Sequence, residues 1–326
     1  MNYSDPIYGD VAIEEPILQD LICSQAVQRL HHILQHGITG LIGLTLPITR
    51  FEHSVGAMLL VKRLGGSVRE QIAALLHDVS HTAFSHVIDY VLDGHDDQSY
   101  HDEMKETYMA TTDLPDVLGR HAYNWTDFVD EAGFSLLEQP SPRLCADRID
   151  YFLRDIIGLG LAEQADIDQA VAHLVVRNGR IALNDLDVAR WFGNTFMQAD
   201  DASWANFREV GLYELTAQAI RRGLELGVIV QNDFWLTDAA LWDKLHAPAD
   251  AQLQTLLGQV SLATQFVWDE ANPTFTVSTK LRAIDPDVWH EGDLRPLSTL
   301  DANFASQRTA YLSRKQGAWP MRVMPG

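Results

Sequence analysis

Histidine and aspartate are neighbours at His77 and Asp78, and His81 follows one helical turn later. Imidazole and carboxylate groups bind borderline and hard divalent metal ions, and both bind in their deprotonated forms. An apolar helical pattern that opens on a capping-box signature, Ser67 to Glu70, precedes the three residues, so we expect a helix to end there. This arrangement favours a metal site, although a single histidine on a helix is more often a hydrogen-bonded or partly exposed residue.

Two other segments carry residues of the same chemical types. The upstream segment 49–53 contains Arg50 and ends at His53, and the downstream segment 147–155 begins at Asp147. On a helix, four polar residues of the downstream segment share one face, opposite an apolar face: Asp147, Tyr151, Arg154 and Asp155. This stripe is compatible with a solvated surface, and also with a site that holds a metal ion, a sugar and a phosphate.

Helical patterns dominate the elements that must position these residues. Apolar residues recur at helical spacing, with caps or first-turn prolines, in a helix from Pro16 and in segments 24–37, 51–64, 67–77, 84–92, 99–109, 141–158 and 205–226. Strand patterns are few. Segments 174–177 and 180–183 flank Asn178-Gly179, which fits a type I′ hairpin, and segment 275–282 alternates as a half-buried strand would. We predict a mainly α fold with a small hairpin and a smaller α/β C-terminal region.

The length and composition fit a globular protein with a main domain and an appendage. A chain of 326 residues with 46% hydrophobic and 21% charged residues can bury a sizeable core. We place the join at the segment 247–250, which contains Pro248. The expected domains are therefore a helical domain over residues 1–246 and a small mixed region over residues 247–326.

Charge and hydropathy restrict the location and the partners. No apolar run reaches the roughly 18 to 20 residues that span a bilayer, and the N-terminus lacks a secretory-signal pattern. Two cysteines, Cys23 and Cys145, form no disulfide framework, so we expect a cytoplasmic protein that does not enter the membrane. The net charge of −21 argues against nucleic acid as a partner, because that needs a basic face. Binding a phosphorylated small molecule needs only local cations or a metal ion.

Several blocks of the chain resemble, in the same order, the HD-domain phosphohydrolases of the deoxynucleoside triphosphate triphosphohydrolase (SAM-and-HD-domain-like) family. The central match is the H…HD…D signature, which here is His53, His77-Asp78 and Asp147. Further matching blocks are segments 5–9, 28–30, 50–54, 81–86, 150–155 and 280–286. The resemblance covers most of the chain and implies that the helical domain over residues 1–246 is an HD domain.

The resemblance implies a ligand set for one divalent metal ion: His53, His77, Asp78 and Asp147. Two imidazoles and two carboxylates admit Fe, Mn, Zn, Ni or Mg, so the residue types do not identify the metal. A metal ion bound there would make hydroxide available at neutral pH and would polarise a phosphorus centre.

The resemblance also implies catalytic residues. His81 corresponds to the family's catalytic histidine, which acts as an acid or a proton relay. His101, together with Asp102 or Glu103, would help to orient it. His86 would contact phosphate, with a buried, hydrogen-bonded histidine as the equally weighted alternative.

Substrate contacts follow from the same comparison. Arg50 matches the family's phosphate-clamping arginine, whose guanidinium suits phosphoryl oxygens. Three residues match positions around the sugar: Gln35, Tyr151 and Asp155. Lys280 and Arg282 lie on the polar side of the expected strand, where they add positive charge or form a solvated edge.

Three departures from the family pattern concern substrate and regulation. Cys23 and His31 stand where nucleotide-activated members carry an aspartate and an arginine for a guanine nucleotide, so regulation of that kind is not expected. The segment 208–213 lacks the Tyr-x-His pattern of triphosphate recognition, and Tyr213 is offset from it. His36 replaces an apolar residue beside the sugar-binding glutamine.

The leading hypothesis is a metal-dependent phosphohydrolase that converts a deoxynucleoside triphosphate to a deoxynucleoside and tripolyphosphate. One alternative is an HD phosphatase or phosphodiesterase that acts on a nucleoside monophosphate or another phosphoester. The other is a non-catalytic nucleotide-binding HD module, since fold does not determine function. The cyclic-dinucleotide branch is disfavoured because its HHE and GYP elements are absent. The resemblance also favours a homo-oligomer.

Overall fold

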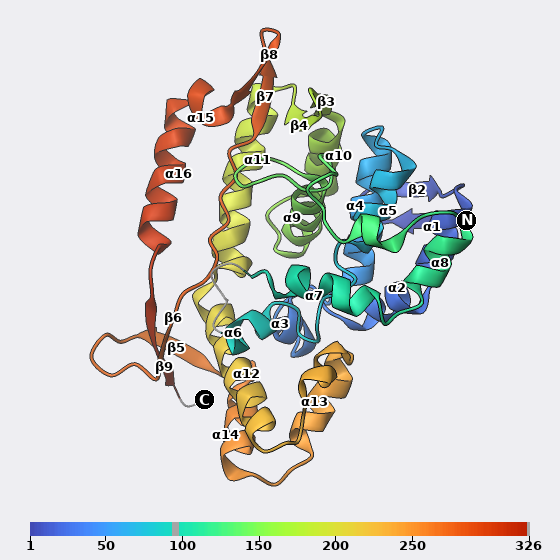
Figure 1. Ribbon diagram of the computed structural model, residues 1–326. Coiled ribbons are helices and arrows are strands. Elements are labelled where there is room, and N and C mark those ends of the chain that lie inside the picture. The colour runs from blue at the N-terminus through green and yellow to red at the C-terminus, as the bar shows by residue number, and fades with distance from the viewer. Residues whose placement is uncertain (93–97, 325–326) are drawn as a thin grey trace.

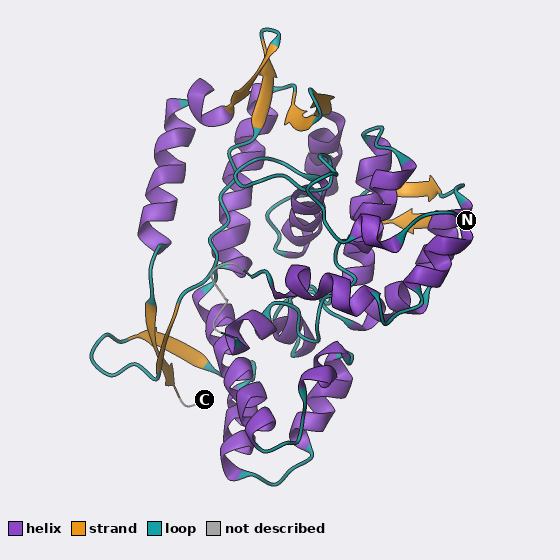
Figure 2. Ribbon diagram, viewed as in Figure 1, coloured by secondary structure: helices purple, strands orange, loops and turns teal. Residues whose placement is uncertain are grey.

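The computed structural model describes residues 1–92 and 98–324, and helices predominate over strands (Figures 1 and 2). The helices are α1 (Pro16–Ile22), α2 (Gln25–Arg29), α3 (Gly37–Leu41), α4 (Arg50–Arg63), α5 (Val68–Leu76), α6 (Val87–Val91), α7 (Tyr100–Met109), α8 (Leu114–Arg120), α9 (Ala146–Gly158), α10 (Gln164–Ala172), α11 (Leu186–Ala199), α12 (Phe207–Glu225), α13 (Asp238–His246), α14 (Ala251–Gln259), α15 (Leu297–Leu300) and α16 (Ala302–Lys315). The strands are β1 (Asn2–Asp5), β2 (Gly9–Ala12), β3 (Leu174–Arg177), β4 (Arg180–Leu183), β5 (Gln265–Trp268), β6 (Phe275–Val277), β7 (Asp287–His290), β8 (Asp293–Pro296) and β9 (Trp319–Met324). The predicted mainly α fold is confirmed.

The helix α4 lies at the centre of the part that carries the predicted site. It begins at a capping box in which the Thr49 hydroxyl accepts from the Glu52 amide and the Glu52 carboxylate accepts from the Thr49 amide. It packs against α5 and α9, and nearly all of its residues from Arg50 to Val61 are buried. Polar side chains of α4 therefore face polar side chains of its neighbours inside the protein.

Two hydrophobic clusters form the core. The first contains buried side chains of α4, α5, α9 and α11, and the second surrounds α12 together with α6, α13, α14 and the C-terminal strands. A π-helical turn, Asp200–Trp204, joins α11 to α12 and so connects the two clusters. Residues that pack against the first cluster and residues that pack against the second can therefore lie close together at this turn.

The strands form three small sheets. The β1-β2 pair is antiparallel, and the hairpin β3-β4 continues into β7 and β8, with Leu183 of β4 opposite Val288 of β7 in a parallel pair. The third sheet has the order β5-β9-β6. Residues after 247 thus pair with the earlier hairpin, and α16 packs on α11 (Figure 1). The predicted boundary at 246/247 falls between α13 and α14, and the division into two domains stays a prediction.

The strongest local signals gave correct elements. The hairpin turn residues Asn178 and Gly179 have positive φ angles of 53° and 71°, as a type I′ turn requires. The Ser67 side chain caps α5 as expected, and α5 ends at Leu76, with His77 as its C-cap. Among the described residues, none of the helices combines the length and apolar character that crossing a membrane demands.

The prediction of one helix over 24–37 is wrong. Ser24 caps α2, but the helical structure ends at His32, and Leu34 forms a β-bridge with Thr49. Gly37 begins α3 instead of ending a helix, with a φ of +50°. A side chain at Gly37 would place its Cβ 2.3 Å from the carbonyl oxygen of Phe84, so glycine allows the two loops to touch.

Three other predicted bounds also need correction. The helix expected from residue 84 begins at Val87, because Phe84 and Ser85 have positive φ angles. The helix expected from residue 141 begins at Ala146. The strand expected over 275–282 ends at Val277, where its pairing with β9 ends. The segment 278–284 is consequently an irregular stretch, not the edge of a strand.

Candidate metal centre

Four predicted ligands come together between α4, the end of α5 and the start of α9. His53 Nε2 lies 2.9 Å from Asp147 Oδ1 and 3.6 Å from Asp78 Oδ2. His77 Nε2 lies 3.4 Å from Asp147 Oδ1 and 3.5 Å from Asp78 Oδ1. Two donors bound at right angles to one ion, each at about 2.1 Å, lie about 3 Å apart. The four groups are therefore spaced like ligands of a single ion.

Hydrogen bonds orient both imidazoles. His77 Nδ1 donates to the carbonyl oxygen of Ala74 at 2.7 Å, and His53 Nδ1 donates to Asp150 Oδ2 at 2.7 Å. When the rings are neutral, the two Nε2 atoms are then bare acceptors, and they lie 3.1 Å apart. Two lone pairs at this distance repel unless a cation lies between them, so this donor set fits a metal ion.

Electrostatics at the site favour a bound cation. Burial lowers the pKa of His77, but the carboxylates of Asp78 and Asp147 raise it to about 10. Burial raises the pKa of Asp78, but Arg50 and His77 hold it well below its ordinary value. Despite burial, hydrogen bonds from His53 and His77 likewise lower the pKa of Asp147. The buried carboxylate of Asp78 and the carboxylate of Asp147, which is 25% exposed, thus stay ionised and attract either protons or a metal ion.

Arg50, the first residue of α4, is held against one of these carboxylates. Its Nη1 donates to Asp78 Oδ2 at 2.6 Å, and its Nε donates to Ser85 Oγ at 3.0 Å. The side chain is 6% exposed and lines the same cavity as the predicted ligands. A guanidinium fixed in this way can direct its other N–H groups at an anion in the cavity.

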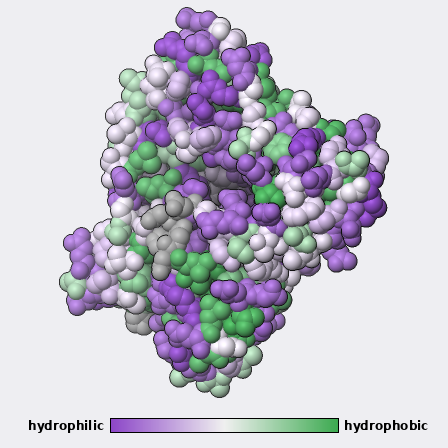
Figure 3. Space-filling model, in the orientation of Figure 1, coloured by the Kyte–Doolittle hydropathy of each residue, from purple (hydrophilic) through white to green (hydrophobic). Residues whose placement is uncertain are grey.

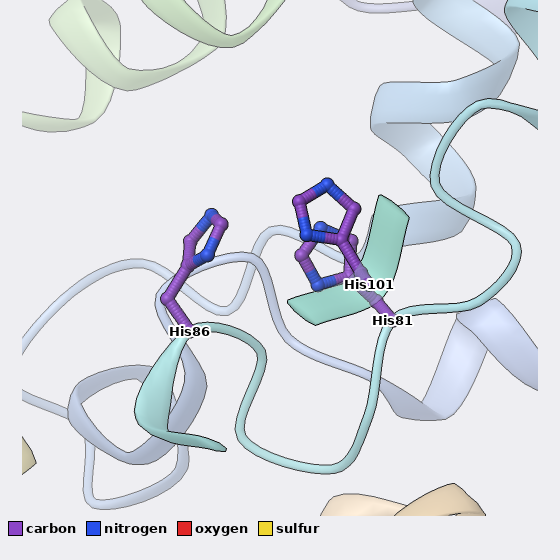
Figure 4. Close-up of side chains that lie close together, drawn as sticks. All are labelled: His81, His86 and His101. Carbon is purple, nitrogen blue, oxygen red and sulfur yellow. The ribbon is translucent and has the colours of Figure 1, made fainter. Parts of the chain in front are cut away.

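A second histidine cluster, formed by His81, His86 and His101, lies beside the first (Figure 4). The rings of His81 and His101 stack, with centroids 3.9 Å apart and 16° between their planes, and His86 stands edge-on to His81. Stacked rings direct their nitrogen lone pairs along parallel planes, so His81 and His101 are not arranged to ligate one ion. His81 Nε2 lies 3.1 Å from Asp78 Oδ1, which connects the two clusters.

The second cluster is uncharged at neutral pH. Burial lowers the pKa of all three imidazoles, and the positive charge of Arg50 lowers it further. The lowered pKa favours the neutral form of each ring, which has one N–H donor and one acceptor nitrogen. Asp102 Oδ1 lies 3.4 Å from His101 Nε2, with its side chain 58% exposed, so it lies beside the stacked pair.

A cavity of about 390 Å³ contains most of the predicted site residues. Ten of the twelve line it: Gln35, Arg50, His77, Asp78, His81, His86, His101, Asp102, Asp147 and Tyr151. His53 does not line it, unlike the other three predicted ligands, and its Nε2 lies 2.9 Å from Asp147 Oδ1. The molecular face in Figure 3 is hollowed near its centre, and hydrophilic side chains border the hollow.

Asp155 has a different environment from the other predicted residues. His36 Nε2 lies 2.9 Å from its Oδ1, and Trp204 Nε1 donates to its Oδ2 at 2.7 Å. It lines a neighbouring cavity of about 430 Å³ instead of the first one. Despite burial, the carboxylates of Asp155 and Glu209 raise the pKa of His36. Both carboxylate oxygens of Asp155 are thus engaged by protein side chains.

Several residues of the cavity wall were not predicted. Arg148, adjacent to Asp147, was available from the motif, whereas Glu131 and Glu138 belong to an irregular stretch without periodicity. Burial and the charge of Asp147 raise the pKa of Glu138 to about 7. Lys280 and Arg282, expected at a strand edge, also line the cavity.

Comparisons with known proteins agree with this geometry. A family model described as the HD domain matches residues 50–155, which include all four predicted ligands. The metal-dependent phosphohydrolase cns2 of Cordyceps militaris is 38% identical over 322 residues, which cover 96% of this chain and 92% of the relative. The chain belongs to the HD-domain phosphohydrolases.

Other relatives of this HD-domain phosphohydrolase include the uncharacterized protein YdhJ of Bacillus subtilis, which is 38% identical over 290 residues covering 89% of each chain. The deoxynucleoside triphosphate triphosphohydrolase SAMHD1 of Danio rerio is 38% identical over 102 residues, covering 27% of this chain and 16% of the relative. A crystal structure of a phosphohydrolase from Bacteroides thetaiotaomicron superposes with a TM-score of 0.75 and 18% identity over 98% of this chain and 99% of the other, which shows the shared fold. The resemblance inferred from the sequence is confirmed.

Proposed function

We propose that this HD-domain phosphohydrolase acts on nucleotides, with a deoxynucleoside triphosphate as its first candidate substrate. The observation that carries the proposal is the convergence of four cationic side chains on the cavity beside the ligand set: Arg50, Arg148, Lys280 and Arg282. A triphosphate has about four negative charges near neutral pH, since a terminal phosphate has a second pKa of about 6. Local cations of this kind let a protein with a net charge of −21 bind a polyanion.

In this proposal, His53, His77, Asp78 and Asp147 hold one divalent metal ion. Such an ion lowers the pKa of water from 15.7 towards about 7 and polarises a phosphoryl oxygen. The two ionised carboxylates retain the cation, and the hydrogen bonds at Nδ1 keep both Nε2 lone pairs directed at it.

The residues around His81 would carry the proton transfer. Water attacks the α-phosphorus, the bond to the 5′ oxygen breaks, and the products are tripolyphosphate and a deoxynucleoside whose 5′ oxygen gains a proton. His81 is neutral because it is buried, so it can accept a proton from water and pass it to that oxygen. His101 stacks on His81 and fixes its plane, Asp102 lies beside His101, and His86 provides a contact for phosphate.

Gln35 and Tyr151, which line the same cavity, would contact the sugar. Within residues 1–92 and 98–324, the buried Oε1 of Gln35 has no hydrogen-bond partner, so it can accept from a sugar hydroxyl. Asp155, the third residue implied for the sugar, would need to exchange its bond with His36 or Trp204 for one with the substrate.

Asp155 is already bonded to His36 and Trp204, and this favours a second candidate function. A phosphatase or phosphodiesterase that acts on a nucleoside monophosphate or another phosphoester needs the ligand set, Arg50 and His81, but no free carboxylate for the sugar. In this candidate, water attacks the phosphorus in the same way. The reaction releases orthophosphate from a monoester or breaks one P–O bond of a diester. The substrate of this candidate is smaller and leaves part of the cationic wall unused.

A screen of products separates the candidates. Purified protein is incubated with Mn²⁺, Fe²⁺, Zn²⁺, Ni²⁺ or Mg²⁺ and with deoxynucleoside triphosphates, ribonucleoside triphosphates or nucleoside monophosphates, and the products are identified. Tripolyphosphate from deoxynucleoside triphosphates supports the first candidate, and orthophosphate from monophosphates alone replaces it with the second. If no pair of metal ion and nucleotide gives turnover, the remaining hypothesis is a non-catalytic nucleotide-binding module. An Asp147→Ala variant controls for contaminating hydrolases.

A further inference from the structure

A chain of buried charged groups extends from His53 away from the cavity. Asp150 Oδ2 accepts from His53 Nδ1 at 2.7 Å and also from Arg154 Nε at 2.7 Å. Arg154 Nη2 donates to Asp150 Oδ1 at 3.1 Å and to Asp5 Oδ2 at 2.8 Å. The other oxygen of Asp5 accepts from the backbone amides of Ile7 and Tyr8, in the turn that joins β1 to β2. The N-terminal hairpin is thus connected to an imidazole of the ligand set through three side chains.

The members of this chain are almost inaccessible to solvent. The side chains of Asp5 and Asp150 are 0% exposed, and that of Arg154 is 3% exposed. A buried carboxylate between an imidazole N–H and a guanidinium is held by charge-assisted bonds from both sides. Their bonds to one another, and not to water, therefore hold these groups in place.

Gly56 completes the arrangement from the opposite side. It lies on α4, three residues after His53 and therefore on the same face. A Cβ at this position would lie 1.8 Å from Arg154 Nη2 and 2.2 Å from Asp150 Oδ1. Only glycine lets the ion pair of α9 pack directly against α4, so the helix surface itself is shaped to admit this network.

We propose that Asp150, Arg154 and Asp5, seated against Gly56, form a positioning network that fixes the ring of His53 and thereby sets the affinity of the ligand set for its metal ion. The inference rests on the proposed assignment of His53 as a ligand. Asp150 keeps the Nδ1 proton in place, which leaves Nε2 as the donor atom and makes it more basic. Arg154 fixes the carboxylate of Asp150, and Asp5 fixes Arg154. These are positioning residues, because none of them lines the cavity.

The test measures metal binding instead of turnover. Protein stripped with a chelator is titrated with Mn²⁺ or Zn²⁺ alone by calorimetry, and cooperative thermal unfolding is recorded for every variant. We expect Asp150→Asn to weaken binding about 10- to 100-fold, the usual effect of removing a carboxylate behind a ligand histidine. Asp5 is separated from the His53 ring by Asp150 and Arg154, so Asp5→Asn should weaken metal binding less. Asp287→Asn is the matched control, because Asp287 is a buried carboxylate paired with Arg180 in the sheet, away from the site, and should keep wild-type affinity.

The outcomes separate this inference from the proposed function. If wild-type protein binds no metal, or if His53→Ala binds as well as wild type, the metal assignment fails and this inference fails with it. If His53→Ala loses the metal but Asp150→Asn and Asp5→Asn keep wild-type affinity, the inference alone is overturned, even when their melting temperatures fall. If Asp150→Asn does not fold, Asp5→Asn decides, since Asp5 makes no direct bond to His53 and bonds to Arg154 and the backbone of the turn.

Discussion

The Nε2 atoms of His53 and His77 lie 3.1 Å apart, although His53 is on α4, His77 caps the end of α5, and each ring donates its Nδ1 proton in another direction. This arrangement fits the proposed metal ion. A cation bound there would offset the charge of the two neighbouring carboxylates, Asp78 and Asp147.

Removal of the metal should reduce both activity and stability. We expect chelator-treated protein to lose hydrolysis and to recover it when the metal is restored. Because the metal binds the folded state, its presence at 100 times the dissociation constant should raise the free energy of unfolding by about 2.7 kcal/mol. Denaturant titrations with and without the metal measure this difference. Equal stability and activity in both forms would contradict a metal site here.

Asp147→Ala should abolish hydrolysis and weaken metal binding by more than about 100-fold, which exceeds the effect expected for groups behind the ligands. Asp147 supplies one of two carboxylates, and the remaining donors leave the cation with less negative charge. Calorimetry with the metal ion and a product assay measure the two effects. The control is Asp187→Ala, which removes a carboxylate that is 89% exposed on α11. Retained hydrolysis in Asp147→Ala would remove Asp147 from the site.

Arg50→Lys should lower kcat/KM by about 10- to 100-fold, which corresponds to about 1.4–2.7 kcal/mol of transition-state stabilisation. A lysine ammonium cannot bond to Asp78 and Ser85 while also directing further N–H groups at a phosphate. Steady-state kinetics on the substrate found in the screen test this expectation. Arg63→Lys, an exposed position on the same helix, is the control and should match wild type. Unchanged kcat/KM in Arg50→Lys would argue against a phosphate clamp.

Asp200 should make stability depend on pH. Its Oδ2 accepts from the Tyr311 hydroxyl at 2.7 Å and from the Arg282 amide at 3.0 Å, and burial raises its pKa from 3.8 to about 6. Folding therefore favours the protonated form, and its contribution to stability is largest at low pH and is lost as the pH rises through 6.

Asp200→Asn keeps an oxygen for both hydrogen bonds and has no charge to bury. Between pH 5 and pH 8, wild type should lose about 1 kcal/mol more of unfolding free energy than this variant does. Denaturant unfolding at several pH values provides the comparison. Parallel pH profiles for the two proteins would show that Asp200 does not titrate in this range.

Arg154→Met should destabilise the protein by about 3–5 kcal/mol, because it leaves the buried carboxylates of Asp5 and Asp150 without their cation. The control is Arg69→Met, whose ion pair with Asp127 is half exposed on both sides and should contribute less than about 1 kcal/mol. Denaturant unfolding measures both values. Equal losses in the two variants would contradict a buried network that depends on Arg154.

The short-range patterns in the sequence were reliable where local chemistry decides the structure. The Ser67 cap and the Asn178-Gly179 turn each formed as expected, because their hydrogen bonds and φ preferences involve residues within a few positions. The bounds that failed depend on distant partners. Gly37 lies where a Cβ would meet the backbone of Phe84, and the strand at Phe275 ends at Val277 because its partner there, Trp319, is the first residue of β9.

The sequence by itself determined the mainly α fold, the family and the chemical types available for the site, since ordered motifs keep their spacing along the chain. Only the tertiary structure decided which polar groups meet. Packing of α9 on α4 places Asp150 and Arg154 behind the ring of His53. Asp155 bonds instead to His36 and Trp204. All three residues nevertheless belong to the same helix as Asp147. Which neighbour each side chain meets depends on how the helices pack, and helical periodicity alone does not contain that information.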